Sequence, residues 1–238
     1  MFRPQMIAEN VKNIQEKIQN ACIMAGRDPN SVTLIAVSKT FRSDEIKEVV
    51  RSGVLDIGES YVQEIIEKRG RVSDPRVRWH FIGHLQSNKV KYIADWVHLV
   101  HSVDNENVAA EIQKRASKLG RVIDVLIEVN TSGEASKFGV SPGRAVDLVG
   151  KISMQQNLRV QGLMTIGPFL PDPEQSRPSF RLLKKVFDEV NAAHILKEPM
   201  KNLSMGMTHD FTVAIEEGAT MVRIGAAIFG TRPKTDVH

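Results

Sequence analysis

The sequence predicts a single α/β domain over residues 1–238, built as a TIM (β/α)8 barrel. Three observations favour this fold. Short apolar, β-branched runs alternate with amphipathic helical segments, eight such runs can be counted, and 238 residues is a usual length for one barrel. A doubly wound sheet of eight strands is the alternative topology. We favour the barrel because no strand-to-helix junction carries the Gly-rich dinucleotide fingerprint expected at a switch point.

The chain opens with an amphipathic helix that is followed by a buried strand. Gly26 is the type of residue that ends such a helix. The run over 32–37 is continuous, apolar and β-branched, which is typical of a strand buried on both faces in a parallel sheet. Apolar residues recur at helical spacing in the first segment at Ile7, Val11, Ile14 and Ile18.

The same alternation continues along the chain. Ser43 is expected to be the N-cap of the second helix, and the Pro-rich stretch over 168–173 a loop after the sixth strand. The further strands are predicted over 55–58, 79–82, 97–100, 122–129, 161–165, 202–204 and 221–224. The further helices are predicted from about 43 and over 60–68, 86–94, 105–118, 143–153, 176–193 and 210–218.

The composition is globular and argues against nucleic-acid binding. Hydrophobic residues make up 42% and charged residues 25%, close to the globular average. The net charge of +4 is spread along the chain, whereas binding of nucleic-acid phosphates needs clustered cations. The tightest basic group is interpreted as a solvated helix end, because acidic residues flank it. It consists of Lys68, Arg69 and Arg71 beside Glu64 and Glu67.

Cysteine content and hydropathy favour a cytoplasmic protein. Cys22 is the single cysteine and cannot form an internal disulfide. The first residues contain no apolar leader segment. The longest uncharged stretch, 160–171, is shorter than the roughly 20 residues of a membrane span. We therefore expect no contact with a membrane.

Polar residues at the predicted strand ends indicate where the chemistry lies, because barrel active sites form at that face. Lys39 follows the first strand; it is either a surface lysine or a partly desolvated amine suited to a Schiff base. Ser204 and Thr208 offer hydroxyl donors after the seventh strand, and Gly225 allows close backbone approach after the eighth. Loops after strands seven and eight are the usual phosphate site of this fold. The pattern describes a site for a phosphorylated carbonyl compound.

Seven stretches, in order along nearly the whole chain, carry a family resemblance. They are AVSK over 36–39, IGESYVQE over 57–64, WHFIGHLQSNK over 79–89, HSVD over 101–104, VNTSGE over 129–134, SMGM over 204–207 and MVRIG over 221–225. With them the sequence resembles the YggS/PROSC family of pyridoxal 5′-phosphate (PLP) homeostasis proteins. Their barrel is similar to the N-terminal domain of alanine racemase, the fold-type III PLP-binding barrel, here without the C-terminal β-domain.

The resemblance implies PLP as cofactor and a role for each site residue. Lys39 would hold PLP as an aldimine, and Arg223 would face the pyridine nitrogen and keep it unprotonated. Ile166 would pack on the ring face, while Ser204, Gly225 and Ala226 would bind the phosphate. No metal is implied. The full set of implied cofactor-binding residues is Lys39, Ser60, Ile166, Ser204, Gly206, Thr208, Arg223, Gly225 and Ala226.

Three positions depart from the family pattern. Ser60 stands where the family has asparagine, so the contact of that asparagine with the cofactor would change. Thr208 replaces a serine and keeps the hydroxyl. His209 stands where an acidic or neutral residue is common and would alter the charge near the phosphate.

Other polar residues have simpler interpretations. His80 and His84 lie on a strand and its turn without a third ligand for a metal, which favours packed or hydrogen-bonded roles. Asp124 and Glu128 share one face of the fifth strand, either as an acid pair or with one of them meeting a lysine.

The resemblance implies a PLP carrier with little or no catalysis. It would bind PLP and amino acids, supply or buffer PLP for PLP-dependent apo-enzymes, and be a monomer. The alternative is an amino-acid racemase, but alanine racemases take a catalytic tyrosine from a C-terminal β-domain, and this chain ends at His238 just past the eighth strand. A phosphosugar-binding barrel enzyme without PLP is a third class, and it would leave Lys39 without a role.

Overall fold

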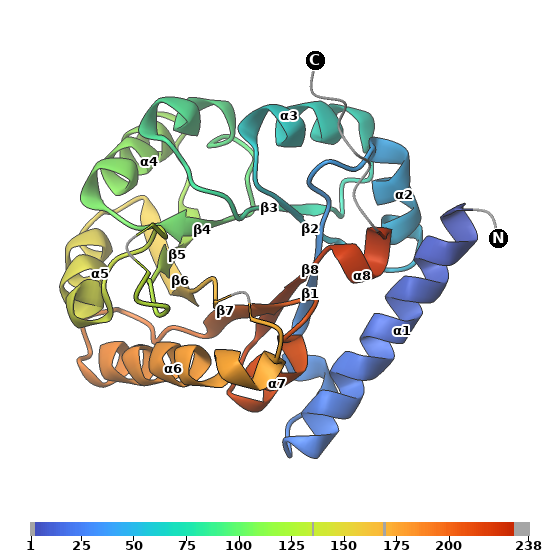
Figure 1. Ribbon diagram of the computed structural model, residues 1–238. Coiled ribbons are helices and arrows are strands. Elements are labelled where there is room, and N and C mark those ends of the chain that lie inside the picture. The colour runs from blue at the N-terminus through green and yellow to red at the C-terminus, as the bar shows by residue number, and fades with distance from the viewer. Residues whose placement is uncertain (1–2, 135, 169, 231–238) are drawn as a thin grey trace.

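Figure 1 shows the computed structural model of the chain, which describes residues 3–134, 136–168 and 170–230. Eight parallel strands follow one another around a closed barrel, and β1 pairs with both β2 and β8. This closure confirms the predicted TIM barrel and excludes the doubly wound sheet. The strands are β1 (Thr33–Val37), β2 (Asp56–Glu59), β3 (Arg78–Phe81), β4 (Leu99–Val103), β5 (Ile123–Glu128), β6 (Leu158–Met164), β7 (Asn202–Met207) and β8 (Met221–Ile224).

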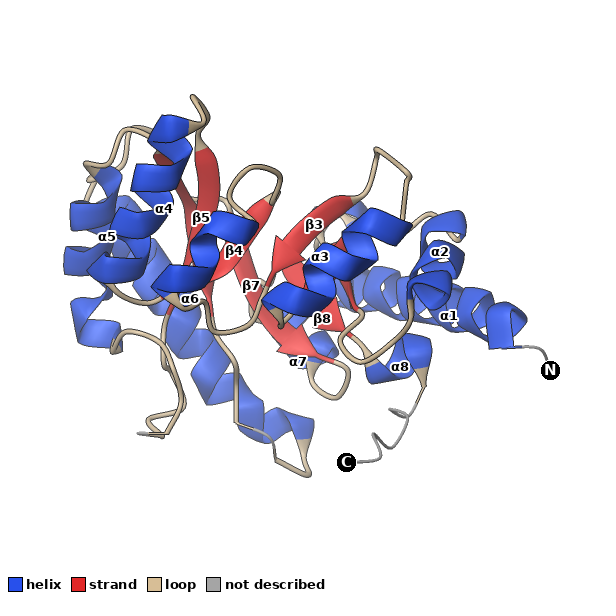
Figure 2. Cartoon of the chain, turned by 90° about the horizontal axis from the view of Figure 1, so that it is seen from above, coloured by secondary structure: helices blue, strands red, loops and turns tan. Residues whose placement is uncertain are grey.

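Helices cover the outside of the barrel, as Figures 1 and 2 show from two directions. The α-helices are α1 (Arg3–Met24), α2 (Ser43–Arg51), α3 (Val62–Arg71), α4 (Glu106–Lys118), α5 (Ala145–Ser153), α6 (Arg177–Ala192), α7 (Phe211–Glu216) and α8 (Ala226–Phe229). Short 3₁₀ helices lie at Pro29–Ser31, Ser87–Tyr92, Pro142–Arg144 and Pro173–Ser176. Within the described ranges, no helix combines the length and the hydropathy that crossing a membrane requires.

The first helix packs as its apolar spacing predicts. Its apolar stripe is at most 4% exposed, and Asn10 on the same helix donates a hydrogen bond of 3.0 Å to the carbonyl oxygen of Ile228 in α8. Gly26, at φ 65°, ends the helix, because the backbone there turns left-handed. The helix thereby holds the chain segment that follows β8. The stripe consists of Ile7, Val11, Ile14 and Ile18.

Two local predictions are wrong. The segment predicted as a helix over 86–94 forms only a 3₁₀ helix, because its first turn is polar and exposed and apolar burial begins at Val90. Ser43 is not an N-cap: it is the first residue of α2, and Arg42 is the cap. The backbone N–H of Arg42 instead donates to the carboxylate of Glu45, 2.7 Å away. That bond satisfies the helix start, so no serine cap is needed.

Strands β4, β6 and β7 extend further than predicted, β4 as far as Val103, and the extension of β7 changes the site. β6 begins at Leu158, and β7 continues to Met207 instead of ending at Ser204. Ser204 therefore lies inside a strand and is fully buried. The Pro-rich loop after β6 is confirmed where it is described, while Phe169 lies outside the described residues.

Candidate functional site

Lys39 lies at the carboxyl end of the barrel strands, two residues after β1. Its side chain lines a cavity of 40 Å³ together with Val37, Phe41, Gly225 and Ala226. The two strands that bring these residues together are adjacent, since Ala36 of β1 pairs with Ile224 of β8. The structure thus places the candidate lysine next to the candidate phosphate loop.

The turn that carries Lys39 is fixed by backbone hydrogen bonds on both sides. The N–H of Ser38 donates to the carbonyl oxygen of Gly58 at 3.0 Å, and the N–H of Phe41 donates back to Ser38 at 3.0 Å. Thr40 adopts φ 69°, which is uncommon for a residue with a side chain. Its N–H donates to a carboxylate oxygen of Glu64, 2.9 Å away. These bonds hold the backbone on each side of Lys39 in one conformation.

Lys68 holds this turn through a hydrogen bond. The prediction that it belongs to a solvated helix end is wrong. Lys68 is only 5% exposed. Its ammonium group donates to the carbonyl oxygen of Ser38 at 2.8 Å, to Glu64 at 2.6 Å and to the carboxylate of Glu59. Burial raises the pKa of Glu59, and the charge of Lys68 partly offsets that rise. Only the ion pair of Lys68 with Glu64 is local in the sequence, so its contacts with Ser38 and Glu59 leave no sequence signal.

The ends of β7 and β8 form the second half of the site. Met207, the last residue of β7, pairs with Arg223, so Thr208 directly after it lies near the end of β8. β1 approaches Gly225 closely: a Cβ atom there would lie 3.1 Å from the carbonyl oxygen of Val37, a tight contact. Ala226 begins α8, so its N–H has no acceptor within the helix. A hydroxyl and a backbone N–H at the ends of neighbouring strands are therefore candidate donors for an anion.

Arg223 places a buried positive charge in the barrel centre. Its guanidinium donates to the hydroxyl of Ser204 at 2.6 Å and to the carbonyl oxygen of Thr165 at 2.8 Å. Both of these partners are uncharged. Burial lowers the pKa of Arg223 to about 10, and the more distant carboxylates of Glu128 and Asp210 oppose the shift. A buried cation with neutral partners is suited to a ligand that offers a lone pair or negative charge.

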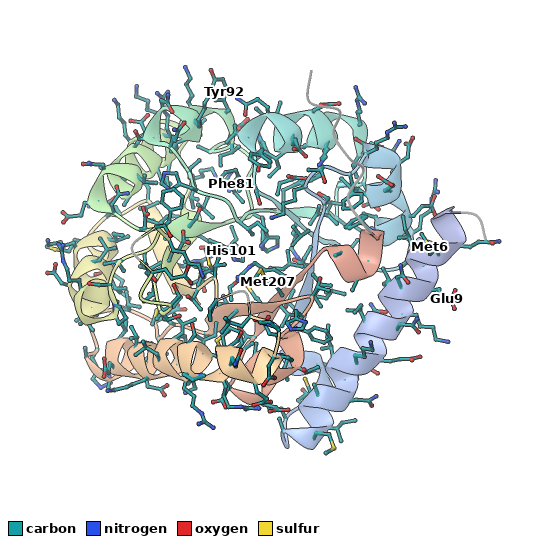
Figure 3. The ribbon with its side chains drawn as sticks, viewed as in Figure 1. Met6, Glu9, Phe81, Tyr92, His101 and Met207 are labelled. Atoms are coloured by element: carbon teal, nitrogen blue, oxygen red, sulfur yellow. The ribbon has the colours of Figure 1, made fainter. Side chains whose placement is uncertain are left out.

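Ser204 takes part in a different contact from the one its sequence position indicates. Its hydroxyl bonds to Arg223 and, at 3.0 Å, to Nδ1 of His101 inside the barrel. Figure 3 shows His101 within the ring of strands. The expectation that Ser204 ends its strand is wrong, and its contact with a phosphate stays a prediction. His101 belongs to the HSVD motif, and no sequence signal assigns it a role.

Three further candidate residues are placed around the same end of the barrel. Ser60 directly follows β2, and its backbone packs on Gly83. Ile166 follows β6 and is 39% exposed, so its apolar side chain is accessible to a ligand ring. Gly206 is explained by packing, since a Cβ there would lie 2.6 Å from Ala214 of α7. The cofactor contacts of all three stay predictions.

The roles of the two histidines and the two acidic residues singled out in the sequence follow from their contacts. His80 is buried and hydrogen-bonded, whereas His84 stacks on Phe138 with ring centroids 3.8 Å apart. Asp124 pairs with Arg159 of β6 rather than with a lysine, at 2.6 Å. Glu128 is 4% exposed; burial and the nearby Asp104 raise its pKa to about 7, against the charge of Arg223.

The donor set at this end of the barrel fits PLP. Lys39 supplies an amine for an aldehyde, Arg223 a buried guanidinium for a ring nitrogen, and Thr208 with Ala226 donors for a phosphate. Among the described residues the buried hydroxyl of Thr40, next to Lys39, has no hydrogen-bond partner. The residues present therefore match an aldehyde, a pyridine and a phosphate in one ligand.

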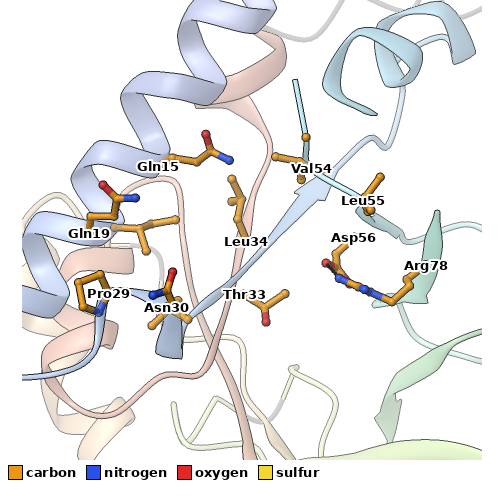
Figure 4. A pocket seen from close by; sticks show the side chains of 13 residues that line it. Gln15, Gln19, Pro29, Asn30, Thr33, Leu34, Val54, Leu55, Asp56 and Arg78 are labelled. Carbon is orange, nitrogen blue, oxygen red and sulfur yellow. Dashed lines mark hydrogen bonds and ion pairs between the residues drawn. The ribbon is translucent and has the colours of Figure 1, made fainter. Parts of the chain in front are cut away.

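A larger cavity at the opposite end of the barrel lacks this chemistry. It measures 370 Å³, and Figure 4 shows Asp56 and Arg78 in its wall. Arg78 is the one cation among its lining residues, and it is paired with Asp56. No lysine amine faces that cavity from the lining residues, so we place the functional site at the carboxyl ends of the strands.

Sequence comparisons identify the family of the chain. The chain matches the alanine racemase N-terminal domain family over residues 3–233. It is 48% identical over 224 residues to a pyridoxal phosphate homeostasis protein of Aquifex aeolicus (strain VF5), covering 94% of this chain and 97% of that relative. It is 35% identical over 229 residues to the protein of the same name from Escherichia coli (strain K12), covering 95% and 97%.

Solved structures show the same barrel. PipY of Synechococcus elongatus PCC7942 with PLP bound superposes with a TM-score of 0.82 at 30% identity, covering 94% of this chain and 100% of that one. An alanine racemase of Clostridium difficile 630 gives a TM-score of 0.75 at 14% identity, covering 97% of this chain and 59% of that one. The racemase likeness is one of fold alone.

Proposed function

The chain belongs to the family of pyridoxal phosphate homeostasis proteins, and we propose from this that it binds PLP and buffers or supplies it. The observation that carries the proposal is the meeting of Lys39, Gly225 and Ala226 in the wall of one cavity. An amine for the aldehyde and an anion loop are the two groups that PLP needs together. When bound, PLP supplies a reactive aldehyde and an aromatic ring that can accept electrons.

Each residue around the cavity has a proposed task. Lys39 would hold the cofactor, because its amine is suited to the aldehyde. Thr208 and the N–H of Ala226 donate hydrogen bonds to the phosphate. Ile166 covers one ring face, and Arg223 donates toward the pyridine nitrogen. Arg223 still carries its proton at neutral pH, because its pKa of about 10 is well above 7.

We propose further that the protein carries PLP and does not use it for turnover. The relatives are named as homeostasis proteins rather than as enzymes. A donor at the pyridine nitrogen keeps that nitrogen unprotonated, which weakens the ring as an electron acceptor. Free amino acids are proposed as further ligands, and PLP-dependent apo-enzymes as the recipients of PLP. We propose that the chain acts as one domain and as a monomer in the cytoplasm, in keeping with its single, buried, free cysteine.

The proposal is tested on the purified protein. An absorbance band of lysine-bound PLP is expected, together with a mass increase on the peptide that contains Lys39 after borohydride treatment. Peptide mapping identifies the modified lysine. Absence of any reducible adduct after incubation with PLP would reject the proposal, and a stable adduct on a different lysine would reject the site.

A further inference from the structure

A continuous line of buried side chains crosses the barrel interior and ends at Arg223. Arg223 donates to the hydroxyl of Ser204 at 2.6 Å, and Ser204 lies 3.0 Å from Nδ1 of His101. Nε2 of His101 lies 3.0 Å from Nδ1 of His80. Nε2 of His80 lies 2.9 Å from Asp56 at the amino end of β2. Five strands therefore contribute one side chain each to a continuous series of hydrogen bonds, which we call the hydrogen-bond chain.

The bond directions are set from both ends, because Asp56 can only accept and Arg223 can only donate. Nε2 of His80 therefore carries a proton and donates to Asp56. With one proton on each ring, Nδ1 of His80 accepts from Nε2 of His101, and Nδ1 of His101 accepts from the hydroxyl of Ser204. The chain thus specifies one tautomer for both histidines.

At the far end of this series of hydrogen bonds, Asp56 is fixed by the charged Arg78. Arg78 donates to Asp56 with its Nε at 2.6 Å, and Figure 4 shows this guanidinium beside the carboxylate. Burial opposes ionisation of Asp56, but hydrogen bonds from Arg78 and His80 outweigh it and lower its pKa to about 2. Asp56 is therefore an acceptor at every physiological pH, which fixes the orientation of His80.

Burial also disfavours a charge on His101. His80 and His101 are at most 1% exposed. Burial lowers the pKa of His101 well below its ordinary value, and the neighbouring His80, Arg223 and His98 add to the effect. A protonated His101 would turn an N–H toward Ser204 and leave the serine hydroxyl proton without an acceptor. The neutral form is the one that leaves each donor in the chain with an acceptor.

We propose that His101 and His80 are positioning residues that orient Ser204 as an acceptor and so hold Arg223 against the cofactor ring. This inference rests on the proposed function for its effect on PLP, but the bond order exists in the protein without PLP. Ser204 is then a support of the guanidinium, not a phosphate ligand. The hydrogen-bond chain would thereby set the position of the Arg223 guanidinium relative to the PLP ring nitrogen.

The first test reads the tautomers directly in the PLP-free protein. Nitrogen-15 NMR of the imidazole rings at pH 7 is expected to show a protonated Nε2 and an unprotonated Nδ1 for both His80 and His101. A proton on Nδ1 of either ring, or a charged ring, would contradict the proposed order of hydrogen bonds. This measurement stands whether or not PLP binds, so it separates the inference from the proposed function.

The second test uses variants with a matched control. His101→Phe removes the acceptor, and we expect a shifted PLP absorbance band and an affinity loss of roughly tenfold or more. His101→Asn keeps an oxygen near Nδ1 and should fall between the wild type and His101→Phe. His98→Phe is the control, because exposed His98 touches the His80 ring edge, with centroids 5.2 Å apart, outside the chain. A folded His101→Phe with the wild-type band and affinity would overturn the proposal.

The third test separates positioning from phosphate binding at Ser204, and it serves if His101→Phe fails to fold. Ser204→Ala should weaken PLP and unphosphorylated pyridoxal by the same factor, because the lost bond positions Arg223. It should also shift the absorbance band as His101→Phe does. A loss confined to PLP, with an unchanged band, would show a phosphate contact and reject the positioning role.

Discussion

The ammonium group of Lys68 donates a hydrogen bond to the carbonyl oxygen of Ser38, 2.8 Å away and one residue before Lys39. Lys68 is thereby the connection between α3 and the turn that presents the candidate cofactor lysine. The same ammonium group neutralises the fully buried carboxylate of Glu59. One side chain on a covering helix therefore fixes the conformation of the site and balances a buried charge.

Lys68→Met is expected to lower the free energy of unfolding by about 3–5 kcal/mol, because Glu59 would remain buried without its partner. Urea denaturation measures the loss. Arg71→Met is the matched control on the same helix: its ion pair with Glu67 is exposed, and its removal should cost less than about 1 kcal/mol. Adding Glu59→Gln to Lys68→Met should recover part of the stability. Equal effects of the two single changes would contradict this account of Lys68.

Lys39→Ala should remove the borohydride-reducible adduct and leave the barrel folded. The side chain lies at the mouth of the barrel and contributes little to the core, so circular dichroism and the thermal midpoint should stay close to those of the wild type. Lys47→Ala, a change of an exposed-face lysine on α2, is the control and should keep the adduct. An unchanged spectrum in Lys39→Ala would assign the Schiff base to another lysine.

Thr208→Val and Gly225→Val should weaken PLP more than pyridoxal. The first change removes a hydroxyl donor to the phosphate, which corresponds to a loss of roughly tenfold. The second is more severe, because the added side chain would press on the carbonyl oxygen of Val37, 3.1 Å from the new Cβ. Equilibrium titrations with both ligands measure the ratio. Equal losses for the two ligands would mean that neither residue contacts the phosphate.

Glu128→Gln should change how stability depends on pH. The pKa of Glu128 rises from 4.5 to about 7 in the folded protein, through burial first and Asp104 second. Its contribution is therefore full below pH 4.5 and is lost as pH rises through about 7, a change of about 3 kcal/mol. Arg223 faces the same carboxyl group and limits the loss. Denaturation of the PLP-free wild type and variant at pH 5 and pH 8 measures it, and parallel pH dependences would contradict the assignment.

Amino acids should turn over at or near background. Racemisation needs a base on each face of the substrate α-carbon, and Lys39 can serve one face only. Incubation of the PLP-loaded protein with L-alanine and other L-amino acids, followed by chiral chromatography, measures D-isomer formation. Robust D-isomer production that disappears in Lys39→Ala would replace the carrier with a racemase.

The barrel could be predicted from the sequence because each strand is a local pattern. Strand β8 has its predicted bounds of 221–224, and the helical stripe of α1 is buried as its spacing indicates. The ends of a strand could not be predicted where pairing with a neighbouring strand decides them. β7 runs three residues beyond Ser204 because β8 continues to pair with it as far as Met207.

The fold class and the residues with distinctive chemistry at strand ends, among them Lys39, Thr208 and Gly225, can be inferred from the amino-acid pattern. Strand ends can be located by pattern, and a barrel gathers them at one face. The contacts between buried polar groups, in contrast, exist only in the folded barrel. Lys68 reaches Ser38 across 30 positions, and His101 reaches Ser204 across 103. Hydrogen bonds over such separations leave no periodic signal in the sequence, because they depend on closure of the barrel and not on local backbone preference.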